Sequence, residues 1–302
     1  MLQRFAPHSK LLRAQSLIGG ISAQMTALEI EQADGQIQKW VLRQPRPSQP
    51  QAAKQAYRLL QSLYAAGLAV PRPLYLDETR EIFPTPYLVI EYIEGQPEFA
   101  PTNPTRFAQQ IAAQLAKIHQ TALPPTEAVF LKPIPQGFHH LSGRQPIAQA
   151  ALPNQAHLYH LLQSQWPPSP RNAPVLLHGD FWPGNWLWHH EQLAAVIDWE
   201  DAALGDPLMD FAICRFDLFW IFGPAVMNLF SQHYQSLITL DPTDLPYWDL
   251  FAALRIAHMV GEDLNTWAAF FHPLGRTDIT AQTIMEHYNL FTTQALDRLT
   301  TP

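Results

Sequence analysis

The sequence predicts an α+β protein in two parts, with a small N-terminal antiparallel sheet and one helix followed by a larger, mostly helical part. Alternating strand patterns separated by turn residues are confined to the N-terminal part of the 302 residues, and helical periodicity dominates the remainder. A chain that is 47% hydrophobic can bury a full core in both parts. We expect the N-terminal part at residues 1–93, the C-terminal part at residues 94–302, and a hinge at about residues 91–98, where Gly95 and Pro97 interrupt the strand pattern.

Turn residues mark the order of elements in the N-terminal part. Residues 17–43 predict a three-stranded antiparallel unit, in which Asp34-Gly35 is the hairpin turn between two alternating segments. A helix follows, and Gly67 suits its C-terminus. The segments expected in this part are strands at residues 26–31, 37–43, 74–76 and 87–92 and a helix at residues 51–66.

The C-terminal part is predicted to consist of helices. Apolar residues recur there at helical spacing, as at Phe107, Ile111, Leu115 and Ile118 on one face. Many Pro, Gln and His residues between positions 124 and 172 indicate a variable insertion with one helix of its own. The expected helices lie at residues 105–120, 154–165, 208–222, 224–237, 246–260 and 280–298.

Composition excludes several classes of protein. A net charge of −7, without a block of Lys and Arg, argues against a general nucleic-acid binder. The longest apolar stretch, residues 218–230, is broken by Gly223 and Pro224 and is too short to span a bilayer, and no secretory signal is recognisable. Cys214 is the only cysteine, which excludes an intrachain disulfide and favours a reducing compartment. We therefore expect a cytoplasmic protein with neither a nucleic-acid nor a membrane partner.

One stretch carries most of the chemistry. His178-Gly179-Asp180 is followed by Asn185, and a short apolar run ends before Asp198. An Asp in a glycine-containing turn is often only a turn residue, but an Asn five positions on and a second Asp after a short strand favour a functional site. Phosphoryl transfer needs a group that orients a hydroxyl, together with hard oxygen ligands for magnesium. Asp180 is therefore the candidate catalytic residue, and Asn185 and Asp198 are the candidate metal ligands.

Two neighbouring residues are secondary candidates. His178 is expected to hydrogen-bond the backbone and support the loop, because a histidine at a strand end beside glycine does this more often than it catalyses a reaction. Glu200 either contacts a second magnesium ion or the acceptor, or caps the segment that follows. A metal-dependent hydrolase built on Asp180, Asp198 and Glu200 is less favoured, because no further His or carboxylate stands at ligand spacing.

Several motifs carry a family resemblance when they are taken together. They are Ile18-Gly19-Gly20-Ile21-Ser22, Trp40-Val41-Leu42-Arg43, Val70-Pro71-Arg72-Pro73, Leu115-Ala116-Lys117-Ile118-His119, His178-Gly179-Asp180 with Asn185, Ile197-Asp198-Trp199-Glu200, and Gly205-Asp206-Pro207 with Asp210. Over about residues 15–215 the chain resembles the aminoglycoside phosphotransferase and choline kinase group of small-molecule kinases. The resemblance implies a two-lobed protein-kinase-like fold that uses ATP, or another nucleoside triphosphate, and Mg²⁺.

The resemblance also assigns nucleotide contacts to the N-terminal lobe. Gly19, Gly20 and Ser22 correspond to the loop that cradles phosphates, although glycines at this place also suit an ordinary hairpin turn. Arg43 occupies the position of the strand cation, where its guanidinium can bind phosphate bidentately. Glu91, at the start of the hinge, completes the expected set of nucleotide-binding residues.

One position departs from the family pattern. Ala56 stands where the family has a glutamate that pairs with the strand cation, so Gln51, Gln55 or Glu29 would have to orient Arg43, unless the helix is shifted by one turn. This departure leaves a nucleotide-binding pseudokinase with a scaffolding or regulatory role as the alternative to an active enzyme.

The family resemblance implies that the phosphate acceptor is a small molecule with a hydroxyl group. Relatives use aminoglycoside-like, choline-like and sugar-like acceptors and bind them with the insertion and the C-terminal helices. The net charge of −7 favours a cationic acceptor, for which Glu262 and Asp263 are candidate acidic contacts. We therefore expect an ATP-Mg-dependent phosphotransferase with an alcohol group as acceptor.

Overall fold

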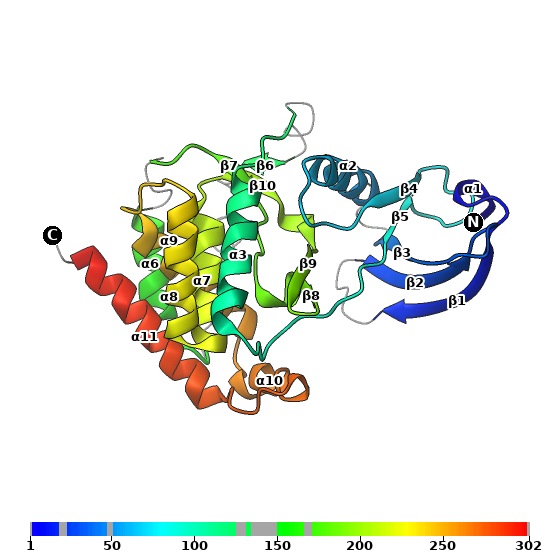
Figure 1. Ribbon diagram of the computed structural model, residues 1–302. Coiled ribbons are helices and arrows are strands. Elements are labelled where there is room, and N and C mark those ends of the chain that lie inside the picture. The colour runs from blue at the N-terminus through cyan, green and yellow to red at the C-terminus, as the bar shows by residue number, and fades with distance from the viewer. Residues whose placement is uncertain are drawn as a thin grey trace. The chain divides into compact units, whose positions relative to one another are not determined.

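The computed structural model describes residues 2–17, 23–46, 51–124, 131–133, 150–165 and 171–300 (Figure 1). The chain divides into two compact units. The first runs up to Gly95 and also contains Ala194–Ile197, and the second contains Gln96–Ala122 and the chain from Leu131 onward apart from that short segment. The predicted nucleotide loop and much of the predicted insertion lie outside the described residues.

The first unit is built on a five-stranded antiparallel sheet with the strand order β1-β2-β3-β5-β4. Its elements are α1 (Leu2–Phe5), β1 (Lys10–Leu17), β2 (Ala23–Glu31), β3 (Ile37–Pro45), α2 (Ala52–Ala65), β4 (Pro73–Asp77) and β5 (Tyr87–Glu91). The β2–β3 hairpin, α2, β4 and β5 lie where the sequence predicts them. At the hairpin turn Gly35 has a φ of 82°, and the backbone N–H of Gln36 donates to the Asp34 carboxylate, as an Asp-Gly turn favours.

The N-terminal elements α1 and β1 differ from the prediction. The pattern places the first strand of the three-stranded unit within residues 17–43, whereas β1 occupies Lys10–Leu17. This strand is an edge of the sheet, and all its residues except the last are exposed, so it has no buried face to produce an alternating pattern. The helix α1 has only 4 residues, which is too short for helical periodicity to reveal.

Apolar side chains of the central strands form the core of the first unit. This buried cluster contains Leu28, Ile30, Leu42, Tyr87 and Val89. Residues two apart on a strand share a face, so Leu28 and Ile30 on β2 point the same way. The helix α2 packs against β3, β4 and β5, and its buried residues are Ala53, Leu60 and Leu63.

The second unit is mostly helical (Figure 1). Its helices are α3 (Pro104–His119), α6 (Gln155–Gln165), α7 (Leu208–Phe222), α8 (Pro224–Leu237), α9 (Leu245–Val260), α10 (Leu264–Ala269) and α11 (Ala281–Thr300), with 3₁₀ turns η2 (Pro183–Asn185), η3 (Trp199–Asp201) and η4 (His272–Leu274). Its described strands include β6 (Lys132–Pro133), β7 (Val175–Leu177) and β10 (Ala203–Gly205), in the order β6-β10-β7, and β8 (Trp186–His189). The strand β9 (Gln192–Val196), which pairs with β8, begins in the second unit and ends in the first.

The helix α7 is central to the second unit. It packs against α8, α9 and α11, and it is buried along its length from Leu208 to Ile221. Burial on all sides explains why its sequence is apolar all round rather than on one face. The few polar residues within it, Asp210, Arg215 and Asp217, therefore need hydrogen-bonding or charged partners inside the protein.

The predicted helices of the second unit are present, and α7 and α8 have the predicted bounds. The helix α10 is not predicted, because its 6 residues are too few to establish a helical period. None of the helices in the described part of the chain is long and apolar enough to cross a membrane.

A buried carboxylate joins α1 to the sheet of the first unit. Asp77, at the end of β4, accepts hydrogen bonds from the backbone N–H and the hydroxyl of Thr79 at 2.8 and 2.6 Å, from the Tyr87 hydroxyl at 3.1 Å and from Arg4 Nη1 at 3.0 Å. Burial alone raises the pKa of Asp77, but these hydrogen bonds outweigh it and hold the pKa below its ordinary value. The stability that Asp77 contributes is therefore present above about pH 4 and is lost as the pH falls through the lowered pKa.

We expect Asp77→Asn to lower the free energy of unfolding at neutral pH by about 2 kcal/mol, because hydrogen bonds to a charged group are lost. Urea denaturation measures the change. Glu78→Gln is the matched control. Among the described residues the Glu78 side chain makes only an exposed ion pair with Lys54 at 3.0 Å, so its loss should cost less than about 0.5 kcal/mol. Equal losses in the two variants would contradict the structural role of Asp77.

Candidate functional site

Residues 178–185, here named the Asp180 loop, follow β7 and are held by a buried carboxylate. Asp210, in the first turn of α7, has no exposed surface. Its two oxygens accept the backbone N–H groups of His178 at 2.6 Å and of Gly179 at 2.9 Å. Because two adjacent N–H groups bind one carboxylate, the start of the loop is fixed in a single orientation relative to α7.

Asp210 is part of a polar network inside the second unit. His119 Nε2 lies 3.4 Å from Asp210 Oδ2, and His119 Nδ1 lies 2.5 Å from the Tyr234 hydroxyl. Burial by itself raises the pKa of Asp210, but the hydrogen bond to His119, the nearby histidines and the backbone N–H of His178 outweigh it and lower the pKa. The carboxylate therefore remains charged at neutral pH and continues to bind the loop.

A second contact joins the Asp180 loop to the 3₁₀ turn η3. The ring centroids of His178 and Trp199 are 4.6 Å apart. Gly179 has a φ of 83°, and a Cβ at this position would overlap the backbone carbonyl of Asp201. Both the conformation and the space therefore require glycine. Because η3 directly follows Asp198, this packing brings the segment of a candidate metal ligand against the candidate catalytic loop.

Asp180 and Asn185 are hydrogen-bonded to each other. Asn185 Nδ2 donates to the backbone oxygen of Asp180 at 3.0 Å and to its Oδ2 at 3.1 Å, and His178 Nδ1 accepts the backbone N–H of Asp180 at 3.3 Å. Both hydrogen bonds of the Asn185 side chain use its amide nitrogen. Its amide oxygen has no hydrogen-bond partner among the described residues and can therefore serve as a metal ligand. The Asp180 side chain is 26% exposed, which leaves its carboxylate accessible to an acceptor.

The structure adds a charged residue that the sequence analysis missed. Arg255, on α9, donates from Nη1 to Asp180 Oδ1 at 2.7 Å, and its Nη2 lies 3.4 Å from Asp217 Oδ2 on α7. Trp220 Nε1 donates to the other oxygen of Asp217 at 3.0 Å. A lone charge within an apolar helix is the signal that could have found Arg255 and Asp217, since such a charge needs a partner.

Asp217 is the most deeply buried acid of this group, with 1% of its side chain exposed. Burial raises the pKa of Asp217 to about 6, against the opposing effects of Arg255 and of the hydrogen bond from Trp220. Burial lowers the pKa of Arg255, but Asp180 and Asp217 outweigh it, so the guanidinium stays charged. One guanidinium thus lies between two carboxyl groups, which gives these three residues a formal net charge of −1.

Asp198 has an uncommon backbone conformation. Its φ of 65° and ψ of 62° are left-handed, which costs a non-glycine residue roughly 1 kcal/mol. The side chain is exposed and makes no hydrogen bond or ion pair with other residues in the described ranges. Glu200, two positions on, is also exposed. An accessible carboxylate in a strained turn suits a ligand-binding role better than a structural one.

The available oxygen atoms fit a magnesium ion that is also held by phosphates. Such an ion is usually bound by one or two protein oxygens, and substrate phosphates and water supply the remaining ligands. The Asn185 amide oxygen and the Asp198 carboxylate are of this kind. Across the described ranges, no group of three or more His, Cys, Asp or Glu residues could hold a metal ion by itself.

The predicted nucleotide residues belong to the first unit. Gly19, Gly20 and Ser22 lie outside the described residues. Glu91 ends β5, where its backbone N–H donates to the Arg72 carbonyl at 2.9 Å and its carboxylate accepts the Arg72 backbone N–H at 3.3 Å.

The strand cation and its possible partners are on neighbouring elements of the same unit. Arg43 lies on β3 in register with Met25 of β2, whereas Glu29 of β2 is in register with Lys39. Glu29, one of the residues proposed to orient Arg43, is thus about 13 Å along the strand from the residue opposite Arg43. Ala56 lies on α2, where the sequence predicts it.

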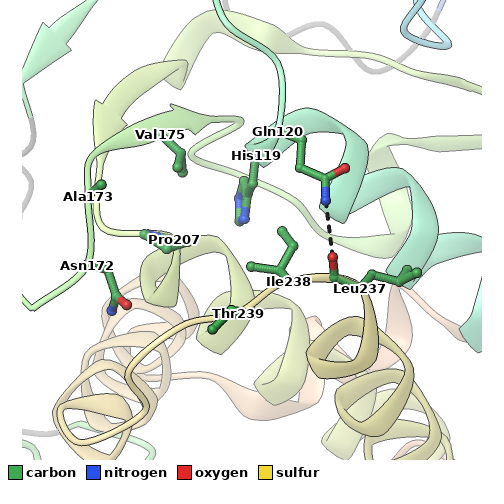
Figure 2. Close-up of a pocket in the computed structure, with 9 residues that line it drawn as sticks. All are labelled: His119, Gln120, Asn172, Ala173, Val175, Pro207, Leu237, Ile238 and Thr239. Carbon is green, nitrogen blue, oxygen red and sulfur yellow. Dashed lines mark hydrogen bonds between the residues drawn. The ribbon is translucent and has the colours of Figure 1, made fainter.

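A separate cavity of about 300 Å³ lies in the second unit (Figure 2). The residues that line it include His119, Gln120, Asn172, Val175, Pro207 and Ile238. Its amide side chains are already engaged, because Gln120 Nε2 donates to the Leu237 carbonyl at 3.1 Å and Asn172 Nδ2 donates to Asp206 at 3.1 Å. None of the predicted site residues lines this cavity, so the candidate site rests on the geometry of the Asp180 loop.

We expect Gly179→Ala to destabilise the protein far more than Gly35→Ala. Both glycines have a positive φ, 83° and 82°, so each alanine costs roughly 1 kcal/mol of backbone strain. An added Cβ also overlaps the Asp201 backbone at Gly179, whereas nothing lies within 4 Å of it at Gly35. Urea denaturation of the two variants measures the difference, and equal losses would rule out the close packing of Gly179 on Asp201.

We expect Asp217→Asn to remove one pH-dependent contribution to stability. The pKa of Asp217 rises from an ordinary 3.8 to about 6 in the folded protein. The contribution of protonated Asp217 to the free energy of unfolding is therefore fully present below about pH 4 and is lost as the pH rises to about 6. Across this pH range the free energy of unfolding of the wild type should fall by roughly 3 kcal/mol relative to that of the variant, at about 1.4 kcal/mol per pKa unit. Denaturation at several pH values tests this, and a pH-independent difference between the two proteins would contradict it.

Comparison with known proteins connects this site to a family. The model of a family described as "Phosphotransferase enzyme family" matches residues 15–250. Among curated proteins, acyl-CoA dehydrogenase family member 11 of Rattus norvegicus is 25% identical over 260 residues, which is 74% of this chain and 33% of the relative. Acyl-CoA dehydrogenase family member 10 of Mus musculus is 31% identical over 175 residues, 53% of this chain and 16% of the relative. This chain thus spans about a third or less of these curated relatives.

Solved structures show the same fold. Macrolide 2′-phosphotransferase MphH from Brachybacterium faecium is 19% identical, with a TM-score of 0.62 and coverage of 100% of this chain and 97% of that one. A spectinomycin phosphotransferase in complex with ADP and spectinomycin is 14% identical, with a TM-score of 0.62 and coverage of 99% and 96%. The predicted α+β, protein-kinase-like fold class is confirmed. Because the family model matches well over half of the 302 residues, this chain belongs to the phosphotransferase enzyme family.

Proposed function

We propose that this protein transfers the γ-phosphoryl group of ATP, with Mg²⁺, to a hydroxyl group of a small molecule. The observation that carries the proposal is the accessible Asp180 carboxylate, which Asn185 and Arg255 hold in place within a chain of the phosphotransferase family. Enzymatic phosphoryl transfer depends mainly on positioning and on charge stabilisation, and this arrangement suits both requirements.

Asp180 is proposed to orient the acceptor hydroxyl and to accept its proton. The carboxylate is 26% exposed, so an acceptor can reach it, and each of its oxygens already receives one hydrogen bond. Strong basicity is not required at this position, because the transition state of phosphoryl transfer is largely dissociative and needs little proton abstraction.

Asn185 and Asp198 are proposed as the magnesium ligands. When bound, Mg²⁺ neutralises charge on the phosphates and helps to align them. The amide nitrogen of Asn185 donates hydrogen bonds to Asp180, so the amide oxygen of Asn185 points away from Asp180. One residue thus orients the candidate base and offers an oxygen to the metal. His178 is proposed to support the loop, and Glu200 remains a secondary candidate for metal or acceptor contact.

The nucleotide is proposed to bind residues of the first unit, with Gly19, Gly20 and Ser22 at the phosphates and Arg43 and Glu91 as further contacts. Solved structures of the same fold include an aminoglycoside 2′-phosphotransferase-IIIa in complex with GDP and the spectinomycin phosphotransferase in complex with ADP, which supports a nucleotide as phosphoryl donor. Arg43, on the central strand β3, offers the guanidinium fork that suits phosphate oxygens.

The acceptor is proposed to be a neutral or cationic hydroxylated molecule of the aminoglycoside-like, choline-like or sugar-like kind. Structures of the same fold were solved with kanamycin, spectinomycin and hygromycin B. In this chain, the net charge of −1 on Asp180, Arg255 and Asp217, and the net charge of −7 on the whole chain, favour such acceptors over anionic ones.

We expect Asp180→Ala to lower the rate of ATP-dependent phosphorylation by about 10²–10⁴-fold, as is typical for loss of a positioned acid–base group. The measurement is a screen of ATP consumption over amino sugars, choline-like alcohols, sugars and other hydroxylated metabolites, followed by kinetics on the acceptor found. Glu286→Ala is the control, since Glu286 on α11 is exposed and accepts a hydrogen bond from Gln282 of the same helix at 2.8 Å.

Two outcomes would overturn this function. Unchanged turnover of a true acceptor by Asp180→Ala would remove Asp180 from its role. Calorimetric binding of ATP-Mg without turnover of any acceptor would favour a nucleotide-binding pseudokinase, an alternative that the alanine at position 56 supports.

A further inference from the structure

Arg255 links the Asp180 loop to the helical core through its two terminal nitrogens. Nη1 is 2.7 Å from Asp180 Oδ1, whereas Nη2 is 3.4 Å from Asp217 Oδ2. The shorter bond is thus to the loop and the longer one to α7, although Asp217 is the more deeply buried acid. The remaining nitrogen, Nε, is buried and has no hydrogen-bond partner among the described residues.

A second arginine–aspartate pair also joins α7 to α9. Arg215 of α7 donates from Nε and Nη2 to the two oxygens of Asp249 on α9, at 3.1 and 3.2 Å, and Arg298 of α11 donates to the same carboxylate at 2.5 Å. This bidentate pair lies between the same two helices and does not contact the Asp180 loop. Arg255 differs from Arg215 in that its stronger hydrogen bond leaves the helices and ends on the loop.

We propose that Arg255 is a positioning residue for Asp180 and that Asp217 controls how firmly it holds Asp180. The inference rests on the proposed function, in which Asp180 orients the acceptor hydroxyl. Arg255 binds Oδ1 of Asp180 and Asn185 binds Oδ2, so two donors from opposite sides fix the rotation of the carboxylate. Removing one donor frees that rotation and misplaces the hydroxyl that the carboxylate orients.

Asp217 competes with Asp180 for the same guanidinium. The groups that face Asp217 are Arg255 on α9, Asp180 on the loop, and Trp220 on its own helix, with Cys214 one turn earlier. Burial raises the pKa of Asp217 to about 6. Below this pH Asp217 is neutral, and the attraction of Arg255 is to Asp180 and, more weakly, to Asp201. Above it Asp217 is charged and draws part of the guanidinium's interaction away from the loop.

The kinetic test compares Arg255→Gln and Arg255→Lys with Arg215→Lys as the matched control, because both lysine variants alter a buried arginine–aspartate contact between α7 and α9. We expect Arg255→Gln to lower kcat about 100-fold, the typical cost of misplacing a reacting group by about 1 Å, while the KM for ATP stays unchanged. The kcat of Arg255→Lys should be about tenfold higher than that of Arg255→Gln, since lysine restores the charge without the planar fork. Arg215→Lys should leave kcat unchanged.

The pH profile separates positioning from a purely structural role. Wild-type kcat should show an inflection near pH 6 that Asp217→Asn lacks and that Arg215→Lys keeps. The proposal is overturned if Asp217→Asn keeps the inflection. It is also overturned if Arg255→Lys and Arg215→Lys lose equal activity, because the effect then follows from helix packing alone.

Hydrogen exchange of the amides at residues 178–186 tests the same proposal without any acceptor. Protection of these amides, corrected for intrinsic exchange, should fall in Arg255→Gln but not in Arg215→Lys. In the wild type, protection should also fall as the pH rises through about 6, whereas in Asp217→Asn it should stay constant with pH. If exchange behaves in this way and no acceptor is phosphorylated, the proposed function fails while the positioning holds. If exchange in Arg255→Gln equals that of the wild type, the positioning itself is wrong.

Discussion

The candidate site depends on one interaction, the binding of two adjacent backbone N–H groups by the buried carboxylate of Asp210. His178 and Gly179 donate to its two oxygens, and Asp210 itself belongs to α7, which is buried from Leu208 to Ile221. A charge without exposed surface is tolerated because donors occupy both oxygens. The start of the loop that carries Asp180 is therefore tied to the helical core.

The polar groups around this loop fall into two sets with different consequences. The first set consists of groups whose hydrogen-bond partners lie inside the protein, such as the backbone N–H groups of His178 and Gly179. These groups hold the backbone of the loop in place. In the second set an oxygen remains available, as at the Asn185 amide and the Asp198 carboxylate. Rigid support beside accessible oxygens is the arrangement that binding of a metal or substrate requires, because the ligands need not reorganise.

The sequence predicted the regular elements where a strong local signal exists. The bounds of α7 and α8 follow from a long apolar run that Gly223-Pro224 interrupts, and the β2–β3 hairpin follows from Asp34-Gly35. The strand β1 and the helix α10 lacked such signals, the first because it is exposed on both faces and the second because it is short. Periodicity reports burial on one face, so elements without that burial escape it.

The sequence by itself determined which chemical groups stand together, because His178, Asp180 and Asn185 lie within one short stretch that Asp198 follows. The hydrogen bond between Asp180 and Asn185 and the packing of Gly179 on Asp201 come from the folded structure. Only the tertiary structure brought Arg255 to Asp180 across 75 positions and Asp210 to the loop across 32. A helical pattern specifies which face of α7 or α9 is buried, but the partner of a buried charge is decided by which helices pack together. The packing of α7 and α9 therefore decides how the Asp180 carboxylate is oriented.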